Sequence, residues 1–144
     1  MSTRRTIEKI TQESFREFGS VVEFPADNRE NFYIVDCDKE NPWRLAVFRY
    51  DNHSIRRIEC HPSSKESFEP LSGTTLLLTA VHENPEDYHI FLLDKPIILD
   101  KGVWHQTMVL TEEAQVKITE NYEVESVFYD LSEEISVYVG GNGE

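Results

Sequence analysis

Short runs of apolar, β-branched and aromatic residues recur along the chain after residue 20, and turn-forming residues separate them. The separators include the segments 25–28 (Pro-Ala-Asp-Asn), 84–87 (Asn-Pro-Glu-Asp) and 94–96 (Asp-Lys-Pro). Many short strands at this spacing are typical of an antiparallel sandwich or barrel, so the pattern predicts an all-β fold. The expected strands cover residues 21–24, 32–35, 45–50, 54–60, 75–81, 89–93, 97–99, 108–110, 115–118, 126–129 and 136–139.

The segment before the first strand predicts a short helix over about residues 11–18. Thr11 can cap its N-terminus, and Gly19 can adopt the left-handed conformation just past its end. Ile10, Phe15 and Phe18 fall on one face of such a helix and would dock it on the sheets. The sequence has no internal repeat and no linker. We therefore expect a single domain over residues 1–144, with a flexible tail at about 140–144.

The composition is that of a folded domain, and its charge limits the classes of partner that the protein can bind. The 144 residues are 39% hydrophobic, and 14 Lys and Arg stand against 27 Asp and Glu, giving a net charge of −13. So few basic side chains argue against nucleic acid or an anionic membrane as a partner. No apolar run approaches the roughly 20 residues of a membrane helix, and none follows Arg4 and Arg5 as in a secretory signal, so we expect a cytoplasmic protein. Cys37 and Cys60 lack metal-type spacing and are expected to be reduced thiols.

Two segments concentrate residues that can transfer protons or bind a metal. In the first, Arg57, Glu59 and His61 alternate along an expected strand and so point to one face. Glu66 can return to that face after an intervening turn. In the second, residues 102–105 (Gly-Val-Trp-His) place an aromatic residue and a histidine at the start of another strand. Converging histidines and carboxylates would supply general acids and bases, or the ligands of a divalent metal.

The same residues carry a resemblance to a known family. His61, Glu66 and Gly73 have the spacing H-x4-E-x6-G, which matches most of the first cupin signature, and Gly102 and His105 match the G-x-x-H core of the second. The chain also resembles the ureidoglycolate lyase (formerly ureidoglycolate hydrolase) family at residues 11–23, 61–62, 68–73 and 102–105, with a weaker echo at 123–126. The resemblance implies a cupin-type double-stranded β-helix barrel with a short N-terminal helix.

Members of this family release urea from ureidoglycolate and leave glyoxylate, in the breakdown of allantoin and other purine products. The resemblance therefore implies a small carboxylate substrate and elimination by general acid and base catalysis, with no required cofactor. At the matching positions, His61, Glu66 and His105 would transfer protons, and Glu59 would orient His61 or act itself. Because such cupins often pair through exposed strands, we also expect a homodimer.

Three further residues are candidates for holding the substrate. Arg49 or Arg57 would bind the substrate carboxylate through a bidentate contact, for which a planar guanidinium is suited. Trp104 would form a wall of the pocket. Arg57 could instead form a structural ion pair with Glu59. Strand register decides which arginine faces the interior, because a slip of one residue turns a side chain to the other face.

The chain departs from the family pattern at three places. Gln106 opens the segment 106–108 (Gln-Thr-Met), where the family usually has a second histidine, a proline and a leucine. Leu99 stands near the position of a common tyrosine, and Glu66 replaces the usual glutamine. Because these changes remove one titratable group and add another, the same reaction does not follow from the resemblance alone.

The departures keep two other functions open. One is a metal-dependent cupin enzyme that acts on another small carboxylate. Two histidines and carboxylates suit Fe(II), Mn(II) or Zn(II), and the ligands would come from Glu59, His61, Glu66 and His105. The other is a cupin that binds a small molecule without catalysing a reaction.

Overall fold

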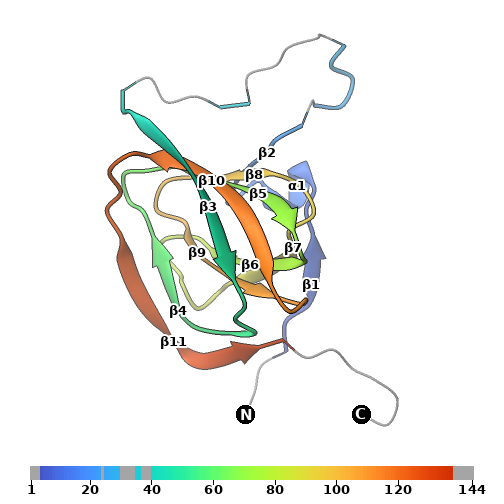
Figure 1. The fold of residues 1–144 in the computed structure, drawn as a ribbon, viewed down its shortest axis with the longest axis vertical. Coiled ribbons are helices and arrows are strands. Elements are labelled where there is room, and N and C mark those ends of the chain that lie inside the picture. The colour runs from blue at the N-terminus through green and yellow to red at the C-terminus, as the bar shows by residue number, and fades with distance from the viewer. Residues whose placement is uncertain (1–3, 24, 30–34, 37–39, 138–144) are drawn as a thin grey trace.

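The structure is a computed structural model, and it describes residues 4–23, 25–29, 35–36 and 40–137 (Figure 1). These residues form two β-sheets and one short helix, α1 (Gln12–Phe15). The six-stranded sheet has the order β1 (Ile7–Lys9), β7 (His89–Leu92), β6 (Thr75–Ala80), β9 (Trp104–Val109), β4 (Ser54–Cys60) and β11 (Val127–Ser136). The five-stranded sheet has the order β2 (Gly19–Val21), β8 (Ile97–Leu99), β5 (Glu66–Ser72), β10 (Ala114–Asn121) and β3 (Trp43–Tyr50).

The strands from β3 to β10 form one long hairpin that coils on itself. β6 and β7 form its tip. Moving outward, β5 pairs with β8, β4 with β9 and β3 with β10, and the pairs alternate between the two sheets. Successive turns of the coil are joined where β6 pairs with β9 and β5 with β10. This nested antiparallel pairing is a double-stranded β-helix, which confirms the predicted all-β, cupin-type barrel.

Two apolar clusters hold the barrel together. Leu77 and Phe91 of the six-stranded sheet pack against Phe68 of the five-stranded sheet, in a core between the two layers. Because side chains alternate along a strand, Leu78 points to the opposite face, where it shares a second cluster with Leu131 of β11. β6 is therefore buried on both faces along its whole length.

The N-terminal helix is shorter than predicted. Thr11 caps it through a reciprocal capping box, as expected, but the helix ends at Phe15. Phe15 and Phe18 are nevertheless buried together with Ile10, so the predicted docking face is confirmed. The prediction that Gly19 caps the helix is wrong. Gly19 opens β2 and pairs with β8, and this pairing draws the chain out of the helix before residue 18.

The strand predictions are best where the apolar runs are continuous. The predicted strands at 54–60 and 97–99 coincide with β4 and β8. β5 was missed because Pro70 and its polar neighbours resemble a loop, and the register of β5 with β10 shifts next to this proline, where a sheet tolerates one. The predicted strand at 126–129 overlaps the start of β11, and the predicted strand at 136–139 overlaps β11 only at Ser136, with residues 138–139 outside the described ranges. The register of β11 with β4 is irregular between Asp130 and Ile135.

Some predictions fall on residues outside the described ranges. They are most of the strand at 32–35, the tail at 140–144, and Cys37. Cys60 is described, and it is a buried free thiol. Within the described ranges, no helix is long and apolar enough to cross a membrane.

The contact between β2 and β8 makes a prediction about stability. A Cβ atom on Gly19, where φ is +157°, would lie 1.7 Å from the carbonyl oxygen of Ile98. We expect Gly19→Ala to lower the free energy of unfolding by roughly 3 kcal/mol or more, because the backbone of β8 must move. Gly102 is the control: its φ is +79°, but the nearest atom to a new Cβ is 3.6 Å away. Gly102→Ala should therefore cost only about 1 kcal/mol. Urea denaturation measures both losses, and equal losses would contradict the steric explanation.

Candidate active site

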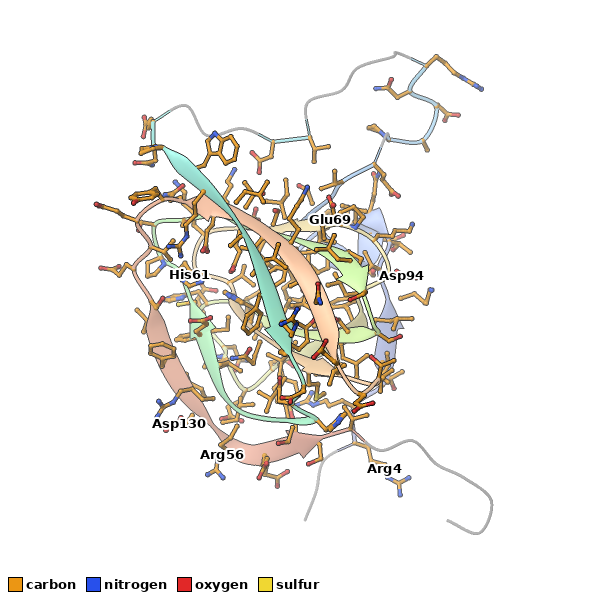
Figure 2. All side chains as sticks on the ribbon, viewed as in Figure 1. Arg4, Arg56, His61, Glu69, Asp94 and Asp130 are labelled. Carbon is orange, nitrogen blue, oxygen red and sulfur yellow. The ribbon has the colours of Figure 1, made fainter. Side chains whose placement is uncertain are left out.

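The candidate residues of the two sequence segments converge inside the barrel. Glu59 on β4 is the cross-strand partner of His105 on β9, so their side chains share one face of the six-stranded sheet. His61 directly follows β4, and Figure 2 shows it at the end of that strand. After a short turn, Glu66 begins β5 in the facing sheet. The structure thus brings together all four residues that the sequence assigned to proton transfer.

Glu66 is the centre of this cluster. Its Oε1 atom lies 2.8 Å from Nε2 of His105 and 3.2 Å from Nε2 of His61. Glu59 is less buried, and its Oε1 lies 4.0 Å from Nε2 of His105. The centres of the two imidazole rings are 5.0 Å apart. A single buried carboxylate oxygen therefore faces two ring nitrogens, an arrangement that needs a positive charge between them.

The opposite ring nitrogens are held by the backbone. Nδ1 of His105 donates to the carbonyl of Val103 at 3.0 Å, and Nδ1 of His61 donates to the carbonyl of Glu125 at 3.1 Å. A carbonyl oxygen can only accept, so Nδ1 carries the hydrogen in both rings. In the neutral form each ring would then turn a lone pair on Nε2 towards Glu66. Protonation of Nε2 converts this repulsion into attraction.

The electrostatics favour protonated rings. Burial lowers the pKa of His61, but the hydrogen bond and charge of Glu66, helped by the Glu125 carbonyl and Glu59, outweigh it and raise the pKa to about 9. Burial raises the pKa of Glu66, but the hydrogen bonds and charges of His105 and His61 outweigh it and lower the pKa to about 2. For His105, Glu66 likewise overcomes burial and raises the pKa. At neutral pH the cluster therefore holds a protonated His61 beside an ionised Glu66 carboxylate.

The cluster lines a pocket of about 350 Å³, which is large enough for a small organic molecule. Phe48, Phe68 and Ile118 supply apolar surface. Arg44 is the one lysine or arginine among the described residues that line it. The pocket therefore combines proton donors and acceptors with a single guanidinium group.

The two arginines predicted to bind the substrate lie outside this pocket. Arg49 alternates with the pocket residue Phe48 and so points to the other face of β3, where its side chain is 66% exposed and lies 3.6 Å from Glu113. Arg57 is 63% exposed and donates to Asp130 of β11 at 2.9 Å. Asp130 is the cross-strand partner of Arg57, and Figure 2 shows it at the edge of the barrel. Neither arginine is among the residues that line the pocket of the cluster.

Trp104 also points away from the pocket. It precedes the inward-facing His105 and so faces the second apolar cluster, on the other side of the sheet. Its Nε1 donates to the carbonyl of His82 at 3.0 Å, and its ring stacks on the ring of His82. Trp104 packs the barrel wall from behind and does not line the pocket.

Sequence reasoning missed two residues of the pocket, Arg44 and Glu120. Nε and Nη2 of Arg44 donate to Oε2 of Glu120 at 3.0 and 2.6 Å. The two residues are cross-strand partners on β3 and β10, 76 positions apart in the sequence. No local motif links them. Finding them requires the register of β3 against β10, and with it the knowledge that the even-numbered residues of β3 face inward.

The departures from the family pattern now have structural positions. The amide of Gln106 donates to the carbonyl of Arg57 and accepts from the backbone of Thr107. It thereby links β4 to β9, whose ladder contains only one residue pair, Glu59 with His105. Leu99 is buried in the core and is the cross-strand partner of Glu66. Gln106 also lines the pocket, so an uncharged amide stands beside the cluster where the family pattern has a second histidine.

Comparison with known proteins identifies the family. A family model described as ureidoglycolate lyase matches residues 24–135. The chain belongs to the ureidoglycolate lyase family. Similar curated proteins include ureidoglycolate lyase 1 of Rhizobium meliloti (strain 1021), which is 28% identical over 130 residues, 76% of this chain and 76% of that protein. Ureidoglycolate lyase of Pseudomonas putida (strain GB-1) is 25% identical over 130 residues, 74% of this chain and 77% of that protein. The resemblance predicted from the motifs is confirmed.

Some solved structures are also similar to the chain. RmlC from Streptococcus suis has a TM-score of 0.48 and 18% identity, covering 57% of this chain and 45% of that chain. A cupin 2 domain-containing protein from Halorhodospira halophila has a TM-score of 0.45 and 9% identity, covering 61% and 57%. The assignment of this ureidoglycolate lyase family member to the cupin-type barrel rests on its own strand pairing.

The residues of this family member also fit a divalent cation. One ligand atom from each of Glu59, His61 and His105 lies within 4.8 Å of the others. Both histidines donate Nδ1 to a backbone carbonyl, the support that metal-binding histidines usually have. Imidazole and carboxylate ligands suit Zn(II), Mn(II) or Fe(II). The groups that could hold a metal are therefore in place.

The shifted pKa values predict how stability depends on pH. His61 has a pKa of about 9 when folded, against 6.5 for the free side chain, so its contribution is complete below pH 6.5 and is lost as the pH rises through 9. The contribution of Glu66, with a pKa of about 2 against 4.5, is lost as the pH falls from 4.5 through 2. From pH 6 to 9.5, we expect the His61 interaction to account for a loss of roughly 3 kcal/mol in unfolding free energy.

Denaturant titrations at the two pH values measure this loss. Glu66→Gln is the comparison, because it removes the partner that raises the pKa of His61, and its stability should fall much less over the same range. The same pH dependence in both proteins would show that the cluster is not protonated as described.

Proposed function

We propose that this protein is an enzyme that releases urea from ureidoglycolate and leaves glyoxylate. Its membership of the ureidoglycolate lyase family supports this activity. The observation that carries the proposal is the cluster in the pocket, where the Glu66 carboxylate lies between two imidazole rings and keeps His61 protonated. Elimination from a carbinolamine needs a proton acceptor, a proton donor and a cation for the carboxylate, and the pocket lining contains each of these groups.

His61 and Glu59 supply the proton donor and the proton acceptor. Glu59 takes the proton of the carbinol hydroxyl, and the oxygen forms the carbonyl group of glyoxylate. The carbon–nitrogen bond breaks, and its electron pair goes to the urea nitrogen, which takes a proton from His61. His61 suits the role of acid because its pKa of about 9 keeps it protonated at neutral pH. Glu59 suits the role of base because it is a carboxylate at the more exposed side of the cluster.

Arg44 is the residue that we assign to the substrate carboxylate. It lines the pocket with the cluster, whereas Arg49 and Arg57 are engaged in ion pairs outside it. Glu120 holds the guanidinium of Arg44 in place through two hydrogen bonds. A planar guanidinium fixed in this way is suited to hold a carboxylate in one orientation.

The first test of the proposal is urea release from ureidoglycolate by the purified protein. His61→Gln removes the acid and should lower kcat by about 100- to 10,000-fold. His53→Gln, a change of an exposed histidine in the turn before β4, is the matched control and should keep full activity. The absence of urea from reactions with the unchanged protein would reject the lyase and favour a cupin that binds a small molecule without catalysis.

The metal-dependent alternative is favoured by one observation, the convergence of Glu59, His61 and His105 within ligand distance of one cation. Such a cation would supply Lewis-acid chemistry to another small carboxylate. For the lyase, we expect urea release to survive extensive dialysis against a chelator, because protons alone balance the charge of Glu66. Loss of activity on chelation, restored by Zn(II), Mn(II) or Fe(II), would move the assignment to a metal-dependent enzyme. Elemental analysis of the dialysed protein shows whether the metal was removed.

The cytoplasmic location, the homodimer and the small carboxylate substrate remain our predictions. For the homodimer, β3 at the edge of the five-stranded sheet supports pairing, because its residues Trp43 and Leu45 lie outside the pocket and are exposed. Light scattering measures the mass of the particle in solution and distinguishes one copy from two.

A further inference from the structure

Glu120 has a carboxylate oxygen that the barrel itself does not use. The side chain is only 8% exposed, and its Oε2 accepts both hydrogen bonds from Arg44. Its Oε1 is buried and has no hydrogen-bond partner among the described residues. A buried acceptor left in this condition costs about 1–3 kcal/mol, and more for a charged group. Such an atom in a pocket indicates that a ligand supplies the missing donor.

Charged neighbours on both flanking strands affect the ionisation of Glu120. Glu66, which is also a carboxylate, is its cross-strand partner on β5, and Arg44 is its partner on β3. Burial raises the pKa of Glu120, the hydrogen bond from Arg44 lowers it and the charge of Glu66 raises it, so the pKa lies above its usual value. A hydrogen-bond donor placed against Oε1 would stabilise the ionised carboxylate of Glu120, whereas an anion there would be repelled by it. The ligand group beside Glu120 is therefore a donor and not a carboxylate.

Glu120 lies next to the reacting groups. One ligand atom from each of His61, Glu66 and Glu120 lies within 4.8 Å of the other two. Glu120 also lines the pocket together with Arg44 and the histidine cluster. A small molecule whose carboxylate is held by Arg44 would therefore extend past Glu120 as it reaches His61.

We propose that Oε1 of Glu120 accepts hydrogen bonds from the N–H groups of a ureido substituent and so selects ureido-substituted carboxylates over plain hydroxy acids. This inference rests on the proposed function, because it assigns the ureido end of that substrate to a residue. A single carbon atom separates the carboxylate from the ureido nitrogen, so the two ends can contact the adjacent residues Arg44 and Glu120. The ureido group supplies several N–H donors, whereas glycolate supplies only one hydroxyl.

The test compares the binding of two unreactive probes by calorimetry in the presence of a chelator. Ureidoacetate has the carboxylate and the ureido group, and glycolate has the carboxylate and a hydroxyl. The unchanged protein should bind ureidoacetate more tightly. Glu120→Gln should weaken ureidoacetate binding by about 10-fold or more, because an amide whose oxygen stays with Arg44 turns an NH₂ donor towards the ligand. The affinity for glycolate should change by less than about twofold.

Glu69→Gln is the matched control. Glu69 lies on β5 but forms an ion pair with Lys117 and does not line the pocket, so this variant makes the same change of charge away from the site. It should bind both probes like the unchanged protein. Arg44→Gln should weaken the binding of both probes.

Three results would overturn the proposal. The first is an equal loss of both probes in Glu120→Gln, which would show that Glu120 only positions Arg44. The second is an unchanged preference for ureidoacetate in that variant, and the third is no such preference in the unchanged protein. Selective binding without urea release would contradict the lyase and leave this inference standing, so the two proposals fail separately.

Discussion

The site depends on one constraint, the burial of the Glu66 carboxylate between two imidazole rings. A charge removed from water must be matched by an opposite charge close by, and Glu66 has both Nε2 atoms within 3.2 Å. The backbone carbonyls of Val103 and Glu125 accept hydrogen bonds from Nδ1 of His105 and His61. Each ring therefore needs a second proton, on Nε2, to donate to Glu66. The electrostatics of the pocket follow from this arrangement. His61 is protonated at neutral pH, and the same geometry would accept a metal cation in place of that proton.

The coiled hairpin explains how so compact a cluster is assembled from distant segments. His61 and Glu66 are neighbours in the sequence, but the turn between them carries the chain from one sheet to the other, so their side chains meet across the barrel. His105 comes from the opposite arm of the hairpin and is brought beside Glu59 by the pairing of β4 with β9. Gln106 supports that junction with hydrogen bonds to both strands. The residue that departs most clearly from the family pattern thus joins two strands and also lines the pocket as an uncharged amide.

The sequence predicted those parts of the fold whose signal is local. The strands β4 and β8 are bounded by turn residues and were found with their correct limits, and the docking face of Ile10, Phe15 and Phe18 follows from helical spacing. β5 was missed because its strand character comes from its neighbours: it lies between β8 and β10, which supply the hydrogen bonds that its own composition does not indicate. The length of the helix was also set from outside, by the pairing of Gly19 with β8.

The residues of the candidate site likewise differ in whether a local sequence pattern identifies them. His61, Glu66 and His105 were predictable because each belongs to a short motif whose spacing is tied to a turn or a strand start. Arg49 and Arg57 show the limit of this reasoning, since alternation along a strand does not say which of its two faces is inside or where a partner strand supplies a countercharge. Arg44 and Glu120 occupy the inner face through a pairing between β3 and β10 that no local pattern encodes. In this double-stranded β-helix, short motifs within one turn of the coil therefore identify the residues that transfer protons. Contacts between the two arms of the hairpin determine which residues bind the substrate. The pairing of Glu120 with Arg44 is a contact of the second kind, and for that reason it is where relatives with the same histidine cluster could differ in specificity.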